Sequence, residues 1–266
     1  MAARTWTRKM GNGLTKQAVP ALLTMLAILV VWQITVEWRD TPRWLLPSPL
    51  DIAIAMIDSA GLLRMHIGVT LLEMGLGFSI ALTLGVLVAV ASHLSGSIRR
   101  SVYPLLVVSQ SVPVIVLAPL LVIWFGFGMA PKVALIVLVC FFPICVSFLD
   151  GLQTADSEIL QLLRAMGANR WQIFRIGRLP AALPALASGS KIAATYSVVG
   201  AVIAEWLGAS KGLGVFLIRS QNSFRADRAL AVIVIVSAIA IAAYLLIELL
   251  ARLSMPWHYG QQGSER

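Results

Sequence analysis

Long apolar runs alternate with short polar segments along the whole chain. Each run carries few or no charged residues, and an α-helix needs about 20 apolar residues to cross a bilayer. Six runs approach or exceed that length, at about 18–36, 67–92, 102–125, 133–149, 188–207 and 229–253. Because lipid offers no hydrogen-bond partners to an open backbone, such runs are expected to be helical. The pattern therefore predicts an all-α polytopic membrane protein with six transmembrane helices.

Composition agrees with this class. Hydrophobic residues make up 59% of the chain and charged residues 12%, roughly half the charged share of an average soluble domain. The net charge of +9 comes from residues scattered between the apolar runs, so it indicates loops beside lipid and not a nucleic-acid surface. No repeat or low-complexity linker occurs. We expect one membrane domain, 18–253, between tails at 1–17 and 254–266.

The orientation follows from the number of spans and the basic residues. Six spans place both termini on one side of the membrane. That side would hold more of the 21 lysines and arginines, which favours cytoplasmic termini. The same topology places the polar stretch 156–184 in the cytoplasm. On the opposite side, Ser48, Pro49 and Asp51 are typical of a helix start, and we expect a short amphipathic helix at about 50–63.

The polar stretch Asp156–Pro184 predicts two short helices. The first is expected at about 157–166, since an aspartate suits a helix N-terminus and Gly167 suits a left-handed C-terminal position. Asn169 then starts the second helix, with Gln172 at the spacing of a capping box. Pro180 and Pro184 are expected to stop it.

The second of these helices carries an unusual surface. Trp171, Phe174 and Arg175 are spaced three and four residues apart, so they share one helix face. One interpretation is an interfacial helix whose aromatic side chains lie among lipid headgroups. The other is a docking surface for a partner protein. Spacing alone leaves both open.

Signals of enzyme chemistry are absent from the sequence. The three histidines are far apart and no HExxH, GxSxG or GxxxxGK[ST] pattern occurs, so the chain lacks the phosphate loop by which many proteins bind ATP. Cys140 and Cys145 are spaced unlike a redox pair or a zinc site, which predicts packed or lipid-facing thiols. No metal site is expected.

Polar side chains within the spans are candidates for a translocation pathway, because burial of a polar group in lipid is costly. The alternative is structural: hydroxyls bond back to their own helix, an amide joins helices, and the glutamates reach the outer interface or pair with basic residues. The candidates are Glu73, Ser109, Gln110, Ser111, Tyr196, Ser197 and Glu205.

The polar stretch resembles the signature of permeases of binding-protein-dependent ATP-binding-cassette importers. That signature reads EAA, three residues, Gly, nine residues, Ile-x-Leu-Pro. Gly167 stands at the glycine position and Leu179-Pro180 at the matching distance. The chain departs from the signature at Gln161-Leu162-Leu163, where EAA is expected, and at Gly177, where Ile is expected.

Further segments are similar to the nitrate, sulfonate and taurine branch of these permeases. They are Leu46–Pro49, Trp124–Gly128 and Glu205–Gly214. Within that branch, the segments Ser109–Pro113 and Met255–His258 are most similar to permeases for the pyrimidine precursor of thiamine. The resemblance leaves riboflavin, sulfonates, taurine or nitrate as alternative substrates.

The resemblance implies a type I importer permease fold with cytoplasmic coupling helices, in a bacterial plasma membrane. It also implies a permease homodimer, two ATPase subunits that bind ATP and magnesium, and an external substrate-binding protein. By this resemblance the coupling residues are Gln161, Gly167, Ala168, Asn169, Arg170, Trp171, Phe174, Arg175, Leu179 and Pro180. Two other hypotheses remain: an intramembrane enzyme, which would need Glu73 and Glu205 to meet, and a membrane scaffold without transport.

Overall fold

The computed structural model describes residues 3–258, apart from the side chains of residues 3–18, 21 and 110. This part of the chain is helical and contains no strand. Its contacts divide it into two compact units. One comprises the residues up to 61 together with 219–231, and the other comprises 62–218 together with the residues from 232 onward. Each unit is described by itself.

The first unit contains α1 (Ala3–Trp38) and α2 (Pro49–Asp58). The predicted start of the amphipathic helix is confirmed, because Ser48 and Asp51 form a reciprocal capping box. The prediction of its end at residue 63 is wrong. The helix ends at Asp58, and α3 (Ala60–Leu94) begins directly afterwards. The second span is therefore part of a helix that starts earlier than residue 67.

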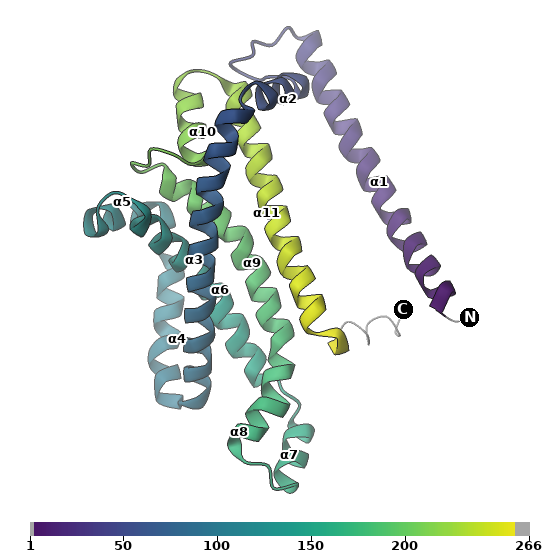
Figure 1. Ribbon diagram of the computed structural model, residues 1–266, viewed down its shortest axis with the longest axis vertical. Coiled ribbons are helices and arrows are strands. Elements are labelled where there is room, and N and C mark those ends of the chain that lie inside the picture. The colour runs from purple at the N-terminus through teal and green to yellow at the C-terminus, as the bar shows by residue number, and fades with distance from the viewer. Residues whose placement is uncertain (1–2, 259–266) are drawn as a thin grey trace. The chain divides into compact units, whose positions relative to one another are not determined.

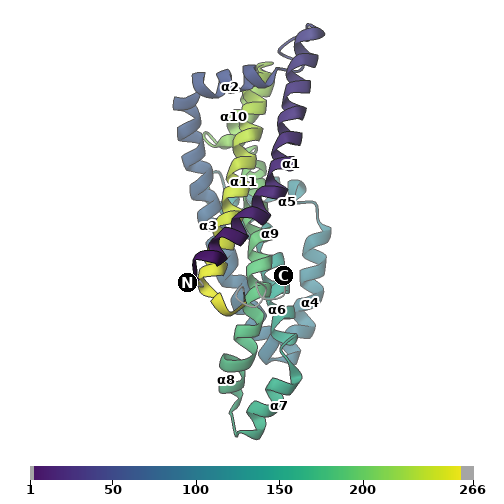
Figure 2. The same cartoon turned by 90° about the vertical axis from the view of Figure 1, so that its right-hand side faces the viewer.

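The second unit is built on α3, α6 (Met129–Gln153) and α9 (Leu179–Glu205), which run alongside one another in Figures 1 and 2. The interface between α6 and α9 is the most extensive in the protein. Small residues allow the close approach: a Cβ on Gly189 would lie 2.6 Å from Cβ of Ser147. On the other side of α6, a Cβ on Gly85 would lie 2.9 Å from Ile144. This packing is typical of membrane helices, whose association depends on close contact.

The third predicted span is two helices. These are α4 (Gly96–Ser111) and α5 (Val114–Phe125), bent by 105° relative to each other (Figure 1). The predicted span at 102–125 is broken at Pro113, because this residue lacks an N–H group and disfavours the helical conformation of the residue before it. Val112 is accordingly extended, with φ −88° and ψ 123°.

The remaining helices are α10 (Leu213–Asn222) and α11 (Ala226–Ser254). Within the described residues, four helices are long and apolar enough to span a membrane, or five if α4 and α5 form one broken span. They include α3, α6, α11 and a continuous helical stretch from Arg170 to Glu205. The apolar part of α1, Leu22–Trp38, is shorter than these. The polytopic helical class is confirmed, and the count of six spans is confirmed only in part.

An ion pair joins α9 to α11 within the second unit. The Nζ atom of Lys191 lies 2.8 Å from Glu248, which also accepts a hydrogen bond from Arg252. Lys191 additionally lies over the ring of Tyr244, 5.6 Å from its centroid. A lysine inside an apolar helix is costly unless it is paired, so this contact fixes which faces of α9 and α11 meet.

We predict that Gly189→Leu destabilises the protein by about 1–3 kcal/mol, because the added side chain has no room between α9 and α6. The matched control is Gly75→Leu on α3, where no atom lies within 4 Å of the added Cβ. Thermal unfolding in detergent, followed by size-exclusion chromatography, should show a lowered Tm for the first variant only. Equal Tm values for both would contradict this account of the α6–α9 interface.

Candidate functional site

The polar stretch folds as a helix–glycine–helix elbow, as the sequence predicts. It contains α7 (Ser157–Ala165), α8 (Arg170–Gln172) and the π-helix η1 (Ile173–Arg178). Asp156 caps α7 by accepting the N–H of Glu158 at 2.8 Å. Gly167 has φ +82°, a conformation that side chains disfavour. In the capping box that starts α8, Asn169 and Gln172 each accept the other's N–H, at 2.9 and 2.8 Å.

The second helix of the elbow does not stop at the prolines, which corrects the sequence prediction. It passes through η1 into α9, so that helix runs without interruption from Arg170 to Glu205. Pro180 falls in the first turn of α9, and Pro184 is accommodated inside it. The wider turns of η1 immediately precede Pro180, and π-helical turns are frequently found at functional positions. The fifth span therefore begins well before residue 188.

The outer face of the elbow is apolar and uncovered. Trp171 is 65% exposed and Met166 75%. Arg170 and Arg175 are also exposed beside them. Aromatic residues and arginine are the residue types enriched at the centres of protein interfaces. This surface, which we call the elbow face, suits contact with another protein.

Aromatic contacts connect the elbow face with the helix core. The ring of Trp171 stacks on Phe174 at 5.7 Å, and Phe174 lies 6.2 Å from the ring of His93 at the end of α3. Phe174 is buried in a cluster that includes Leu149 of α6. The guanidinium of Arg178 lies 2.6 Å from Nε2 of His93. Since a guanidinium can only donate, Nε2 of this histidine accepts.

The two departures from the importer signature lie against each other. A Cβ on Gly177 would lie 2.9 Å from Leu160 and 3.2 Å from Leu163. Leu163 stands at one of the EAA positions, where the signature has a small residue. Leu163 of α7 is larger than the residue in the signature, and Gly177 of η1 is smaller. The space left by the glycine accommodates the leucine, so the two segments pack closely.

A buried polar network lies at the other end of α9. His66, Thr70 and Glu73 are spaced four and three residues apart on α3, so they share one helix face, and all are buried. The first two bind the backbone at the start of α10. His66 Nδ1 accepts the N–H of Gly212 at 2.9 Å, and the Thr70 hydroxyl accepts that of Leu213 at 3.0 Å.

Glu205 completes this network from α9. It accepts the hydroxyl of Thr70 at 2.6 Å and the N–H of Gly214 at 2.5 Å. Glu73 is paired with Lys132 of α6 at 2.5 Å. Gly212 has φ +131°, and a Cβ there would overlap the Glu205 carboxylate, so only glycine fits. Removal of one partner from such a buried group is strongly destabilising.

Comparison with known proteins decides the family. Residues 81–254 match the family described as "Binding-protein-dependent transport system inner membrane component". This match covers the elbow, the part of the buried network formed by Lys132, Glu205 and Gly212–Gly214, and the spans between them. The chain belongs to this permease family.

Individual relatives agree with this membership. The permease is 38% identical to the formylaminopyrimidine transport permease protein ThiX of Halalkalibacterium halodurans over 92% of this chain and 98% of that protein. It is 36% identical to a probable ABC transporter permease protein of Haemophilus influenzae (85% and 93% covered) and 31% identical to the riboflavin transport system permease protein RibX of Chloroflexus aurantiacus (90% and 91%). Its fold is similar to that of a chain in the inward-facing MetNI methionine ABC transporter, with a TM-score of 0.60 at 20% identity over 72% of this chain and 97% of that one.

Membership places the chain among the permease components of ABC importers, which work with an ATPase and a substrate-binding protein. These components are membrane subunits and not enzymes. The coarse function expected from the sequence is thereby confirmed. The roles of individual residues stay predictions, and the geometry shows what each of them contacts.

The predicted coupling residues are held together in the elbow. Gln161, Gly167, Asn169, Arg170, Trp171 and Arg175 are exposed, Ala168, Leu179 and Pro180 are half-buried, and Phe174 is buried. Their arrangement gives one outward face and one aromatic contact into the core. Sequence reasoning missed His93, although its place at the end of an apolar span was a usable signal.

The predicted pathway residues do not form one cluster. Ser109 and Ser197 each donate to a carbonyl of their own helix at 2.7 Å, and Ser111 does so at 3.4 Å. This is the structural alternative left open by the sequence. Tyr196 is 47% exposed on α9. The side chain of Gln110 lies outside the described part of the structure.

Glu73 and Glu205 are the exception, because the fold brings them together. Glu73 is paired with Lys132, and Glu205 accepts the hydroxyl of Thr70, which stands one turn before Glu73 on α3. Sequence reasoning missed the partners of this pair, His66, Thr70 and Lys132. The spacing of the first two with Glu73 on one face of an apolar helix could have revealed them. Both glutamates hold the ends of helices in place, whatever further role they have.

We predict that Thr70→Val destabilises the permease by about 1–3 kcal/mol, because it removes one of the two hydrogen bonds to the Glu205 carboxylate and the acceptor of the Leu213 N–H. The matched control is Thr83→Val on the same helix, since the Thr83 hydroxyl donates only to Ser79 of its own helix. Thermal unfolding and limited proteolysis of the 206–212 loop should separate the two variants. Unchanged protection of that loop in Thr70→Val would contradict its anchoring by the network.

Proposed function

We propose that this permease carries a pyrimidine precursor of thiamine, of the formylaminopyrimidine or hydroxymethylpyrimidine kind, into the cytoplasm. The observation that supports this most directly is the 38% identity to the formylaminopyrimidine permease of Halalkalibacterium halodurans, over 98% of that protein. The similarity extends through the spans as well as the elbow. Riboflavin is the second candidate, favoured by the 31% identity to the riboflavin permease, and taurine, aliphatic sulfonates and nitrate follow.

The proposed assembly is a permease homodimer in the bacterial inner membrane with two ATPase subunits. ATP and magnesium bind to those subunits, and this chain binds no cofactor. The termini and the 156–184 stretch lie in the cytoplasm in this arrangement, and the substrate-binding protein docks on the opposite side. The excess of basic residues on the side of the termini supports that orientation.

The elbow face is proposed to lie in a groove of the ATPase. Trp171 and Met166 supply exposed apolar area, and Arg170 supplies a charge at its edge. When the ATPases close on ATP, this face moves with them. The stacked Trp171 and Phe174 rings deliver the displacement to the core of the second unit, and the contact between Arg178 and His93 delivers it to the end of α3.

Energetics limit this coupling. ATP can shift the permease from inward- to outward-facing only if the closed ATPases bind one conformation more tightly than the other. A shift from mostly one state to mostly the other needs a differential of roughly 5 kcal/mol. Several buried apolar contacts on the elbow face can supply this, whereas a single exposed ion pair cannot.

The substrate assignment predicts selective uptake. Proteoliposomes that contain the permease with its ATPase and binding protein should accumulate labelled formylaminopyrimidine when ATP is inside. Unlabelled hydroxymethylpyrimidine should compete, and riboflavin and taurine in equal excess should not. Vesicles loaded with a non-hydrolysable ATP analogue serve as the control. ATP-dependent uptake of riboflavin or taurine in preference would overturn the substrate and leave the transport function intact.

The coupling role predicts that Trp171→Ala lowers the affinity for the ATPase at least about tenfold, because a buried interface tryptophan contributes about 2 kcal/mol or more. Uptake should fall with it while membrane insertion is unchanged. The matched control is Trp38→Ala on α1, a tryptophan 84% exposed and outside the elbow. Co-purification of the ATPase and uptake are the two readouts. Equal values for both variants would argue against the elbow face as the ATPase contact.

A further inference from the structure

A polar cavity lies in the second unit, between the beginning of α4 and the end of α6. Its volume is about 560 Å³. Asp150 belongs to the last turn of α6, which leads directly to α7. The cavity is thus at the end of the helices that carries the elbow. Its lining residues are Gly96, Arg99, Arg100, Tyr103, Pro104 and Asp150.

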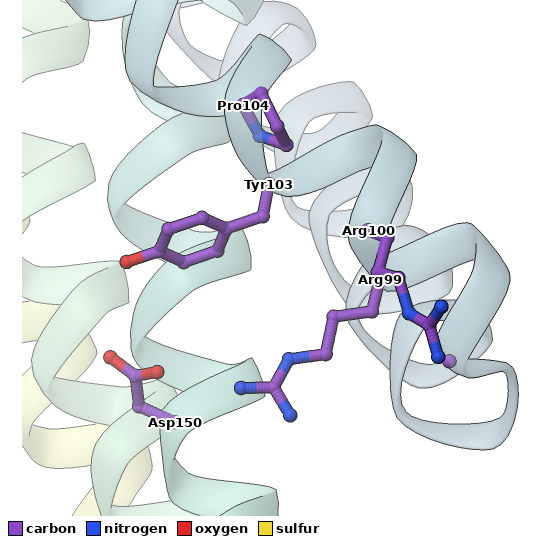
Figure 3. Close-up of a pocket in the computed structure, with 6 residues that line it drawn as sticks. Arg99, Arg100, Tyr103, Pro104 and Asp150 are labelled. Carbon is purple, nitrogen blue, oxygen red and sulfur yellow. The ribbon is translucent and has the colours of Figure 1, made fainter.

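Opposite charges face this cavity from two helices. Figure 3 shows a common space between the two helices. Three groups are turned towards it: the guanidinium of one of the two arginines, Arg99 or Arg100, the hydroxyl of Tyr103 and the carboxylate of Asp150. The limit for an ion pair is an N···O distance of 4.0 Å. Among the residues that the structure describes, no lysine, arginine or histidine nitrogen lies that close to the Asp150 carboxylate. The cavity therefore separates a basic side from an acidic side.

This separation selects the chemistry of an occupant. A simple anion at the arginines would be repelled by Asp150, and a simple cation at Asp150 would be repelled by the arginines. A molecule with a phosphate and an ammonium group a few bonds apart satisfies both sides at once. The phosphate would accept charge-assisted hydrogen bonds from a guanidinium and the Tyr103 hydroxyl, and the ammonium would donate to Asp150.

The surface of α4 beside the cavity is apolar. Beyond Tyr103, α4 exposes Leu105 (68%) and Val108 (61%). Tyrosine is enriched at the level of lipid headgroups. Basic pockets between helices on the cytoplasmic side are known to hold lipid headgroups. An occupant with a polar end in the cavity and an apolar part along α4 matches this surface.

We propose that the cavity binds the headgroup of a phospholipid with a free amine, such as phosphatidylethanolamine. The phosphate lies at the Arg99–Arg100 pair and Tyr103, the ammonium lies at Asp150, and an acyl chain follows the apolar surface of α4. Bound lipid thereby links α4 to the turn of α6 that precedes α7. The site concerns the permease alone, so its failure and the failure of the proposed transport function are distinguishable.

The test measures lipid binding to the purified, delipidated permease by native mass spectrometry and thermal shift. The probes are phosphatidylethanolamine, phosphatidylglycerol, phosphatidylcholine and soluble phosphoethanolamine. We expect phosphatidylethanolamine to bind about tenfold more tightly than phosphatidylglycerol, whose headgroup lacks the cation. Phosphatidylcholine should be weaker, because its methylated amine cannot donate to Asp150.

Variants locate the site. Asp150→Asn should abolish the preference for phosphatidylethanolamine over phosphatidylglycerol, and Arg99→Gln combined with Arg100→Gln should weaken both lipids about tenfold. The control is Arg64→Gln, which removes an exposed arginine of α3 outside the cavity and should change neither. Because the preference is a ratio within one preparation, a lower yield of folded variant does not affect it.

Three outcomes would overturn the proposal. Equal binding of all three lipids would show that the cavity does not distinguish their headgroups. The same conclusion would follow if the preference for phosphatidylethanolamine over phosphatidylglycerol persisted in Asp150→Asn. Tight binding of phosphoethanolamine without lipid selectivity would indicate a soluble zwitterion as the occupant. Efficient disulfide cross-linking of two copies through Tyr103→Cys would show that a second permease covers the cavity.

Discussion

Polar groups that enter a bilayer must find their partners inside the protein, because lipid offers none. The second unit of this permease follows that constraint at two places along α9. In the middle of the helix, Lys191 is paired with Glu248 of α11. At the end of the helix, Glu205 is held by Thr70 and the N–H of Gly214. Each pairing fixes one helix against another in a single register, since a shifted register would leave a charge unpaired.

Packing then makes the same helices a rigid block. Gly189 of α9 and Gly85 of α3 each admit α6 to close contact, so any relative shift of these helices would cause overlap. A block of this kind does not deform gradually, and it moves as a whole or changes between discrete arrangements. The exposed elbow is small in comparison. Phe174 connects the elbow to the block, and under the proposed coupling a push on the elbow would reach the block through this residue.

Local features of the sequence were predictable because they depend on neighbouring residues. The capping box of Asn169 and Gln172, the left-handed Gly167 and the start of α2 at Pro49 all follow from short-range hydrogen bonding and backbone sterics. The apolar spans were predictable because the composition of each run indicates a membrane helix without reference to distant residues. The elbow was recognisable as the signature of the permease family even with Gly177 in place of isoleucine.

Contacts between distant segments were not predictable from those signals. Nothing in the sequence shows that Lys132 pairs with Glu73, because 59 positions separate them and their register depends on tertiary packing. The effects of two prolines on helix continuity were also predicted incorrectly, in opposite senses. Pro113 breaks a span that composition treats as one, whereas Pro180 follows the π-helical turns of η1 and the helix continues past it. The difference lies in the local helix geometry at each proline.

The continuity across Pro180 has a mechanical consequence. Residues 170–205 form one helical stretch of 36 residues, and at 1.5 Å per residue it is roughly 54 Å long. Trp171 stands at one end, on the elbow face, and Glu205 stands at the other, bound to the start of α10. A helix broken at the prolines would absorb a displacement of the elbow in a flexible joint. Under the proposed coupling, an unbroken helix would transmit it, and the hydrogen bond from Gly214 to Glu205 would make α10 follow. Gly214, which satisfies the buried carboxylate of Glu205, would then tie the far end of the permease to the movement of its elbow.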